Sequence, residues 1–355
     1  MHKLSIEQKL FAKRQQINRW RRLHRQKMKA RRAQHRAHKK ITSKAYRARQ
    51  VVMPVPVIVK IKDYEPRGQL LAFIEHANRI LMGGGSIRLD FSKITELHPC
   101  GTLIFMANFD IWIERYPGKI QGNYPDDEVV EQLLQHFKVM EKLGLPNRKT
   151  INHDRVRFWH YKSGKTVDAA AYRDLATTVR DNIEHPEREL FADCLNEAVA
   201  NTVGHAYDFE KPWLPPHDHR KWWVVSSLRD EHVFVAIYDM GVTIPGSLRR
   251  KPELSDFLRL RRFKDARLIE AATASSRTST RLPHRGKGLP EMLEFSRNLA
   301  SGFLSIVSGR GAYYYDPQTG VASRKNLECT IPGTLVLWQI PFEQHIDERE
   351  NDLNS

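Results

Sequence analysis

The phrase NEAVANTVGHAY at residues 196–207 places Glu197, Asn201 and His205 at four-residue steps. Steps of four keep side chains on one side of an α-helix. A carboxylate, an amide and an imidazole in one line could together handle a water or hydroxyl group, a metal ion and a phosphate. A surface helix with a solvated polar face is the alternative interpretation, and this phrase alone does not decide between the two.

A second phrase, VFVAIYDMGVTIPG, ends an apolar run with Asp239 and follows it with Gly241. A carboxylate at the end of a buried strand is poorly solvated unless another group donates a hydrogen bond to it. The exocyclic amine of a purine would serve as that donor. Glycine lacks Cβ and lets the backbone approach a flat ring. An ordinary aspartate and glycine at a strand-to-turn junction is the alternative.

A third phrase, HRGKGLPEMLEF, places Gly286, Lys287 and Gly288 in front of an expected helix. Glycines at a helix start allow backbone N–H groups to face an anion, and the positive end of the helix dipole favours it. Lys287 would add a point charge. A flexible turn is the alternative for this phrase.

Other candidate motifs lack a required part. A phosphate-binding loop around SGKT at 163–166 needs a glycine at position 159, which is Trp159. The HDH triplet at 217–219 could ligate a metal, but no further ligand cluster accompanies it, which favours a polar loop. No GxSxG phrase supports a serine hydrolase.

Hydrophobic periodicity indicates the elements that must position these residues. Two strand-like runs are separated only by Asp230–Glu231, which predicts a hairpin. Runs of strands after runs of helices favour an α+β layered fold. Helices are expected at 68–82, 100–115, 129–145, 169–183 and 187–207, and strands at 57–61, 87–92, 156–161, 221–229, 232–239, 304–308 and 335–340.

The charge of the chain is concentrated at its N-terminus. Residues 1–50 hold 18 Lys and Arg against one acid, Glu7, whereas residues 51–355 hold 40 basic and 40 acidic residues. The three cysteines have no metal spacing and favour neither a disulfide framework nor an oxidising compartment. No run of eighteen apolar residues occurs, so no membrane span is expected. We therefore expect a cytoplasmic protein with a basic helical or disordered tail at 1–50.

In this order the phrases resemble the motifs of the GHKL superfamily, the ATP-binding domains of gyrase, heat-shock chaperones, histidine kinases and mismatch-repair ATPases. Glu197 and Asn201 match its E-x-x-x-N helix motif, and Asp239 and Gly241 match D-x-G-x-G, with Thr243 in place of the second glycine. The helix phrase is most similar to that of anti-sigma-factor serine kinases. The Thr243 side chain would narrow the adenine pocket or alter the hinge of the lid.

Two later phrases extend the resemblance to roughly residues 165–342. Gly286–Leu289 match the glycine-rich turn that closes the ATP lid, and Gly333–Thr334 match a late G-T pair. The lid would span about 246–285 and is rich in arginine. The resemblance implies a GHKL-type α/β sandwich at 160–345, with a mixed, largely antiparallel sheet and a helical layer. Residues 346–355 are expected to form a polar C-terminal tail.

The resemblance also implies ATP and Mg²⁺ as cofactors and a role for each residue. Asn201 would hold the Mg²⁺ that bridges the phosphates, and Glu197 would orient or deprotonate the attacking oxygen. Asp239 would accept from the adenine amine. The other residues implied in nucleotide binding are His205, Gly241, Gly286, Lys287, Gly288, Leu289 and Thr334.

Residues 51–150 resemble a STAS domain, the fold of anti-sigma-factor antagonists, through IRLDFSKITELHPCGTLIFMANF. Signalling members have a phosphorylatable serine in the turn, where this chain has Pro99. The resemblance therefore implies a small α/β domain that docks a protein partner without a standard phospho-switch. A homodimer stays an open alternative.

These expectations lead to two hypotheses of function. The first is a Mg·ATP-binding regulatory protein, either a slow ATPase or a protein serine kinase. The second is a nucleotide-gated interaction or scaffold protein without meaningful catalysis. In either case the tail would be drawn to a polyanion, with nucleic acid as the candidate and little sequence preference. A solubilising arm is the alternative for the tail.

Overall fold

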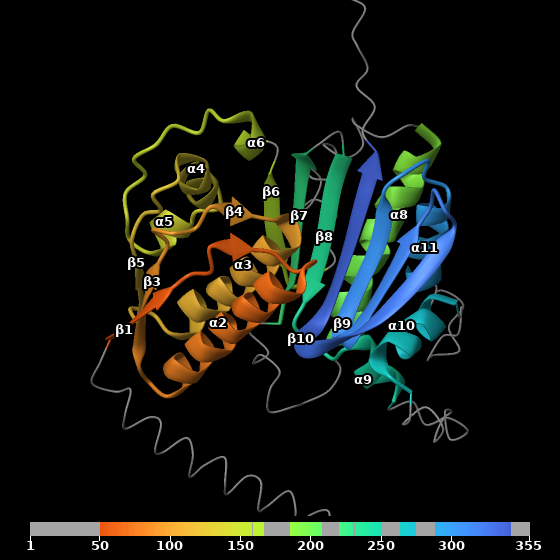
Figure 1. Ribbon diagram of the computed structural model, residues 1–355, viewed down its shortest axis with the longest axis horizontal. Coiled ribbons are helices and arrows are strands. Elements are labelled where there is room, and N and C mark those ends of the chain that lie inside the picture. Colours follow the sequence, from red (N-terminus) through yellow and green to blue (C-terminus); the bar gives the residue numbers. More distant parts are fainter. Residues whose placement is uncertain are drawn as a thin grey trace, which may run out of the picture.

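The computed structural model describes residues 50–157, 159–166, 185–207, 220–229, 232–249, 263–274 and 288–341. The basic segment before Gln50, the expected helix at 169–183, the histidines at 217–219 and the tail at 346–355 lie outside these ranges. The described part combines helices with one antiparallel sheet and two smaller parallel sheets, which confirms the predicted α+β class (Figure 1).

The larger sheet is antiparallel throughout and has the strand order β6-β7-β8-β10-β9. The predicted pairing of strands 221–229 and 232–239 is confirmed, because these strands are antiparallel neighbours with Arg229 opposite His232. The last two strands extend well beyond the expected 304–308 and 335–340. The strands are β6 (His160–Gly164), β7 (Trp222–Arg229), β8 (His232–Asp239), β9 (Phe303–Asp316) and β10 (Val321–Pro341).

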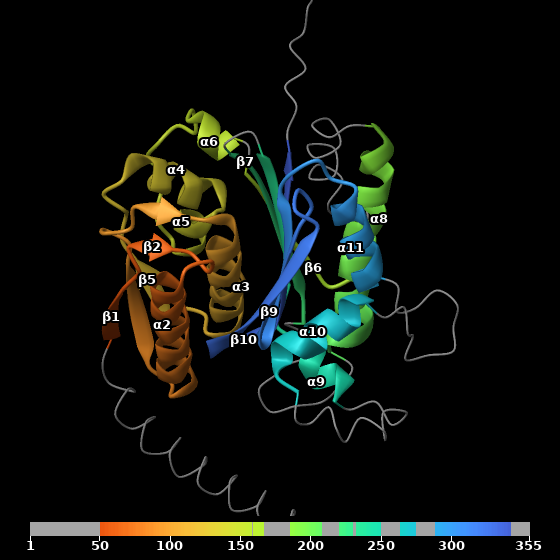
Figure 2. The same cartoon turned by 45° about the vertical axis from the view of Figure 1, so that its right-hand side comes forward.

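A layer of helices covers one face of this sheet, as expected from the sequence (Figure 2). Alternation along the strands directs Trp222, Val235 and Trp338 to this face, where they pack with Phe191 and Phe295. The layer consists of α8 (His185–Asn201), a π-helical turn η2 (Thr202–Ala206), α9 (Ile244–Leu248), α10 (Asp265–Ala274) and α11 (Gly288–Arg297).

An N-terminal α/β unit covers the other face. Its three-stranded sheet is parallel and has the order β1-β3-β5, with a short parallel pair β2-β4 beside it. The strands are β1 (Gln50–Pro54), β2 (Ile58–Val59), β3 (Ser86–Asp90), β4 (Glu96–Leu97) and β5 (Ile120–Gly122). The helices are α2 (Tyr64–Met82), α3 (Pro99–Arg115), α4 (Glu128–His136), α5 (Val139–Lys142) and α6 (Asp154–Arg157).

Two expectations for this part of the chain were wrong. The single helix expected at 129–145 is interrupted after His136, because Lys138 adopts a left-handed conformation with φ of 58°. The strand expected at 156–161 is instead the short helix α6 followed by β6, which begins at His160.

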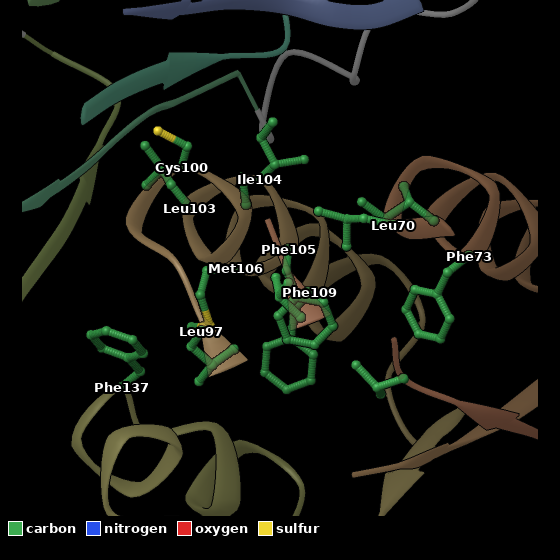
Figure 3. Close-up of a cluster of buried hydrophobic side chains, with 14 of the residues drawn as sticks. Leu70, Phe73, Leu97, Cys100, Leu103, Ile104, Phe105, Met106, Phe109 and Phe137 are labelled. Carbon is green, nitrogen blue, oxygen red and sulfur yellow. The ribbon is translucent and has the colours of Figure 1, made fainter. Parts of the chain in front are cut away.

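Helix α3 lies between the two sheets and is buried on all sides from Pro99 to Trp112. Figure 3 shows Cys100 and Ile104 on the side of α3 next to the antiparallel sheet, with Phe105 and Phe109 turned toward the N-terminal core. One continuous apolar cluster therefore joins the N-terminal unit to the sheet. This explains why the helix sequence is apolar all round.

Buried Asp110 is the polar centre of this junction. Its carboxylate accepts hydrogen bonds from Lys142 (2.6 Å), from the hydroxyl of Tyr161 (2.5 Å) and from the indole of Trp223 (3.2 Å). Three donors from three elements satisfy the charge within an apolar surrounding, as a buried carboxylate requires. Helix α3 is thereby held to β6 and β7.

Candidate functional site

One row of residues crosses all five strands of the antiparallel sheet at the same level. Gly164 lies opposite Trp222, Trp222 opposite Asp239, Asp239 opposite Thr334, and Thr334 opposite Ser308. Directly opposed residues point to the same face of a sheet. This face is the one covered by α8 and α11, so Asp239 and Thr334 lie on the side of the helical layer.

Asp239 is a buried carboxylate whose hydrogen bonds come from backbone N–H groups. Its Oδ1 accepts from Gly241 N at 2.7 Å, and the N–H of Thr334 also donates to the carboxylate. Burial raises the pKa of Asp239 to about 7, although the two N–H donors oppose that shift. A further neutral donor would favour the ionised form.

Gly333 permits the strands to meet at this level. Its φ of 73° is in the left-handed region, and a Cβ there would lie 1.8 Å from the backbone oxygen of Asp239. No other residue type fits such an approach without moving one of the strands. The G-T pair noted in the sequence therefore has a structural reason at its first position.

Ser308 completes the row, and the sequence reasoning missed it. Its fully buried Oγ donates to Gly333 O (3.0 Å), accepts from Ile244 N (2.9 Å) and lies 2.9 Å from Thr334 Oγ1. The hydroxyl thus connects β9, β10 and the start of α9. A serine at the end of an expected strand is a weak signal, and only strand register reveals that it faces Thr334.

Glu197 and Asn201 both lie against the first residue of α11. A Cβ on Gly288 would be 2.4 Å from Asn201 Nδ2, 2.4 Å from Glu197 Cγ and 3.0 Å from Glu197 Oε1. The first and third sequence phrases, nearly ninety residues apart, are therefore in contact. The positive end of the α11 dipole lies beside the carboxylate and the amide.

The four-residue spacing does not continue along an α-helix as far as His205. Helix α8 ends at Asn201, and Thr202–Ala206 form the π-helical turn η2. The backbone hydrogen bonds therefore change from the i→i−4 to the i→i−5 pattern after Asn201. Thr202 Oγ1 donates to Ala198 O at 3.1 Å, a bond that bends helices.

The π-helical turn brings the first phrase to the second. Ala206 O accepts from Val242 N at 2.6 Å, and a Cβ on Gly241 would lie 2.1 Å from that oxygen. The backbone of Ala206 thus occupies the space that a side chain at Gly241 would need. The sequence had instead predicted that a flat ring of a ligand would lie there. The hydroxyl of Tyr207 accepts from Met240 N at 3.1 Å and strengthens this junction.

Thr243, which replaces the second glycine of the motif, begins helix α9. Its φ of −61° and ψ of 152° are ordinary for a threonine, and its Oγ1 accepts from Gly246 N at 3.0 Å. This is a standard N-cap. The described parts of the expected lid are α9 and α10, and Arg249 joins them through Asp265 at 2.6 Å.

The remaining expected residues are placed as follows. Leu289 packs against the apolar cluster under the helical layer. Gly286 and Lys287 lie outside the described residues, as does the side chain of His205. Within the described ranges, no three His, Cys, Asp or Glu side chains gather as a metal cluster. None of the helices described is long and apolar enough to cross a membrane.

Comparison with known proteins adds no family assignment, because no protein-family model and no curated protein matches this chain. The conclusions about function therefore rest on the residues and their geometry.

Proposed function

We propose that this chain binds Mg·ATP in a site of the GHKL type formed by α8, the end of β8 and the start of α11. The observation that carries the proposal is the contact of Gly288 with both Glu197 and Asn201. The two phrases resemble separate motifs of one nucleotide site, and they are adjacent in space. If the sequence matches were accidental, there would be no reason for the two phrases to be in contact. The turn η2 links the same helix to Gly241, two residues after Asp239.

Asp239 is suited to hold the base. Its pKa of about 7 reflects burial, and among the described residues no Lys, Arg or His forms an ion pair with it. A neutral N–H donor fits such a carboxylate better than a cation, because a donated hydrogen bond offsets desolvation without burying a second charge. The adenine exocyclic amine is a donor of this kind.

The phosphates would lie at the start of α11. A helix N-terminus presents free N–H groups and a positive dipole end to an anion. The amide oxygen of Asn201 would ligate Mg²⁺, which supplies charge neutralisation for the phosphates. Glu197, one helical turn before Asn201, would accept the proton of an attacking water or protein hydroxyl. The reaction would then be either slow ATP hydrolysis or transfer of the phosphoryl group to a protein.

Calorimetric titration with ATP and Mg²⁺, together with a phosphate-release assay, tests this proposal. We expect the parent protein to bind ATP, and a Glu197→Ala variant to bind it while losing turnover. Glu294→Ala is the matched control, because Glu294 lies on the exposed side of α11 and pairs only with Arg297 among the described residues. Absence of adenine-nucleotide binding in the parent protein would refute the site.

A nucleotide-gated interaction protein is the second candidate, and the tryptophan pair favours it. Trp222 lies opposite Asp239 on one face of the sheet, whereas its neighbour Trp223 contacts Asp110 of α3 on the other face. A change at the nucleotide side would thus reach the N-terminal unit through adjacent residues of β7. ATP-dependent changes in partner binding without phosphate release would favour this function.

The N-terminal unit itself is proposed as a STAS-like docking domain for a protein partner. Its helix α3 is covered by the sheet of the same chain, so we place any partner on its remaining surface. The cytoplasmic location and the homodimer stay proposals.

A further inference from the structure

A cavity of about 310 Å³ lies between the N-terminal unit and the antiparallel sheet. Small-molecule sites measure roughly 300–1,000 Å³, so this cavity is at the lower end of that range. Its floor is apolar and comes from the sheet, with Phe234, Phe303, Val307, Leu335 and Leu337. Its opposite wall comes from the segment 60–62 after β2, from β4 and from the starts of α2 and α3.

This cavity is separate from the proposed nucleotide site. Adjacent residues of a strand point to opposite faces, so Leu335 faces the cavity while Thr334 faces Asp239 and the helical layer. The same alternation separates Val307, which lines the cavity, from Ser308. One molecule cannot occupy both positions, because the sheet lies between them.

Arg67 is a buried cation on the cavity wall. Its side chain is 5% exposed, and its Nη1 donates to Ile61 O at 3.2 Å. Its Nε has no hydrogen-bond partner, and no carboxylate among the described residues pairs with it. The guanidinium carbon also lies 5.9 Å from the centre of the Tyr64 ring. Neither this ring nor one carbonyl supplies the charged partner that would offset the desolvation of a buried guanidinium. An anion in the cavity would supply the missing partner.

Cations outnumber carboxylates around the cavity, although one of them, Lys60, already pairs with Asp63 at 2.9 Å. Lys60 and Lys62 line it together with Arg67, against one carboxylate, Glu96. The ammonium of Lys62 lies 5.8 Å from the centre of the Phe303 ring, so the cationic wall and the apolar floor adjoin. The cavity thus combines an excess of positive charge with an aromatic and aliphatic surface.

We propose that this cavity is a second ligand site, and that its ligand is a small amphipathic anion. A single carboxylate or phosphate group would pair with Arg67, which can donate through Nε and a terminal nitrogen in the bidentate geometry that both groups accept. The apolar body would lie on Phe234, Phe303 and Leu337. The proposal does not depend on ATP binding.

Isothermal titration of the full-length protein with octanoate and with octyl phosphate tests this site. We expect one molecule bound per chain, with 1-octanol and octylammonium at least tenfold weaker because they lack the anionic group. Preference for one anion identifies the head group as a carboxylate or a phosphate. Saturating ATP should not displace the bound anion.

Variants locate the binding. Arg67→Met should weaken it at least tenfold, whereas Arg79→Met removes an exposed guanidinium from the same helix and should leave it unchanged. If Arg67→Met does not fold, Ala312→Leu fills the cavity from β9 and should also abolish binding. Failure of both anions to bind, equal binding of octylammonium, displacement by ATP, or unchanged affinity in Ala312→Leu would each overturn the proposal.

Discussion

Gly288 and Asn201 are in direct contact, with the α-carbon of one residue against the side-chain amide of the other. A Cβ at residue 288 would lie 2.4 Å from Asn201 Nδ2. Real Cβ atoms do not approach other atoms so closely, so any other residue at this position would displace the side chains of Asn201 and Glu197. This contact connects helix α8 to the glycine-rich phrase and is the geometric basis of the proposed nucleotide site.

Gly288→Ala should therefore destabilise the protein by about 1–3 kcal/mol, because the added methyl group displaces Asn201 and Glu197. ATP affinity should fall as well. Gly68→Ala is the control: Gly68 lies inside α2 with no atom within 4 Å of the new methyl group, so this variant should gain about 0.4–1 kcal/mol. Urea unfolding and calorimetry measure both. Equal stability in the two variants would contradict the contact.

Asp239 should make the stability of the protein depend on pH. Its pKa is raised from 3.8 to about 7, so the folded state binds this proton more tightly than the unfolded state. The contribution of this proton to the free energy of unfolding is fully present below pH 4 and is lost as pH rises through 7. The loss is on the order of a few kcal/mol. Asp239→Asn should remove this part of the pH dependence.

Unfolding of parent and Asp239→Asn proteins between pH 4 and pH 8 measures the difference. The free energy of unfolding of the parent should decrease relative to that of the variant over this range. A constant difference between the two proteins would mean that the carboxyl group titrates at its ordinary pKa.

Ser308→Ala should cost about 1–3 kcal/mol, because it leaves the N–H of Ile244 without its buried acceptor. Ser296→Ala is a matched control. Ser296 is equally buried, but its hydroxyl only donates to Met292 O of its own helix, and we expect a change below about 0.5 kcal/mol. Chemical denaturation measures the free energy of unfolding of both variants. Similar losses of stability in the two would show that the hydrogen bonds of Ser308 do not stabilise the sheet.

Asp110→Ala should weaken the junction of α3 with the antiparallel sheet. It removes the acceptor of Lys142, Tyr161 and Trp223, and leaving buried polar groups without partners costs about 3–5 kcal/mol. Asp126→Ala removes an exposed carboxylate 3.7 Å from Lys93 and should change stability by less than about 1 kcal/mol. Trp223 fluorescence and thermal unfolding report the effect.

The basic tail should account for nucleic-acid binding. Deletion of residues 1–49 retains Gln50, where β1 begins, and removes the segment with the excess positive charge. Binding of the full chain to a mixed-sequence RNA or DNA should fall steeply with salt, and the deletion should abolish it. Salt-sensitive binding that survives in the truncated protein would place the contact elsewhere.

The sequence alone determined the features that depend on neighbours in the chain. The sequence predicted β7 and β8 and their pairing, because 221–229 and 232–239 are strand-like apolar runs separated by only two residues. It also identified Glu197, Asn201 and Asp239 as candidates. Helix 129–145 was predicted as continuous, since no periodicity reveals the left-handed turn at Lys138.

Only the tertiary structure decided which of these residues meet. Strand register aligned Asp239 with Thr334 and Ser308, and the packing of α11 brought Gly288 to Asn201. The α-helix expected to continue to Tyr207 instead ends at Asn201 and is followed by a π-helical turn. The cavity at Arg67 arises where the N-terminal unit packs on the sheet. Local patterns report the period of each element, whereas such contacts depend on the relative placement of elements distant in the chain.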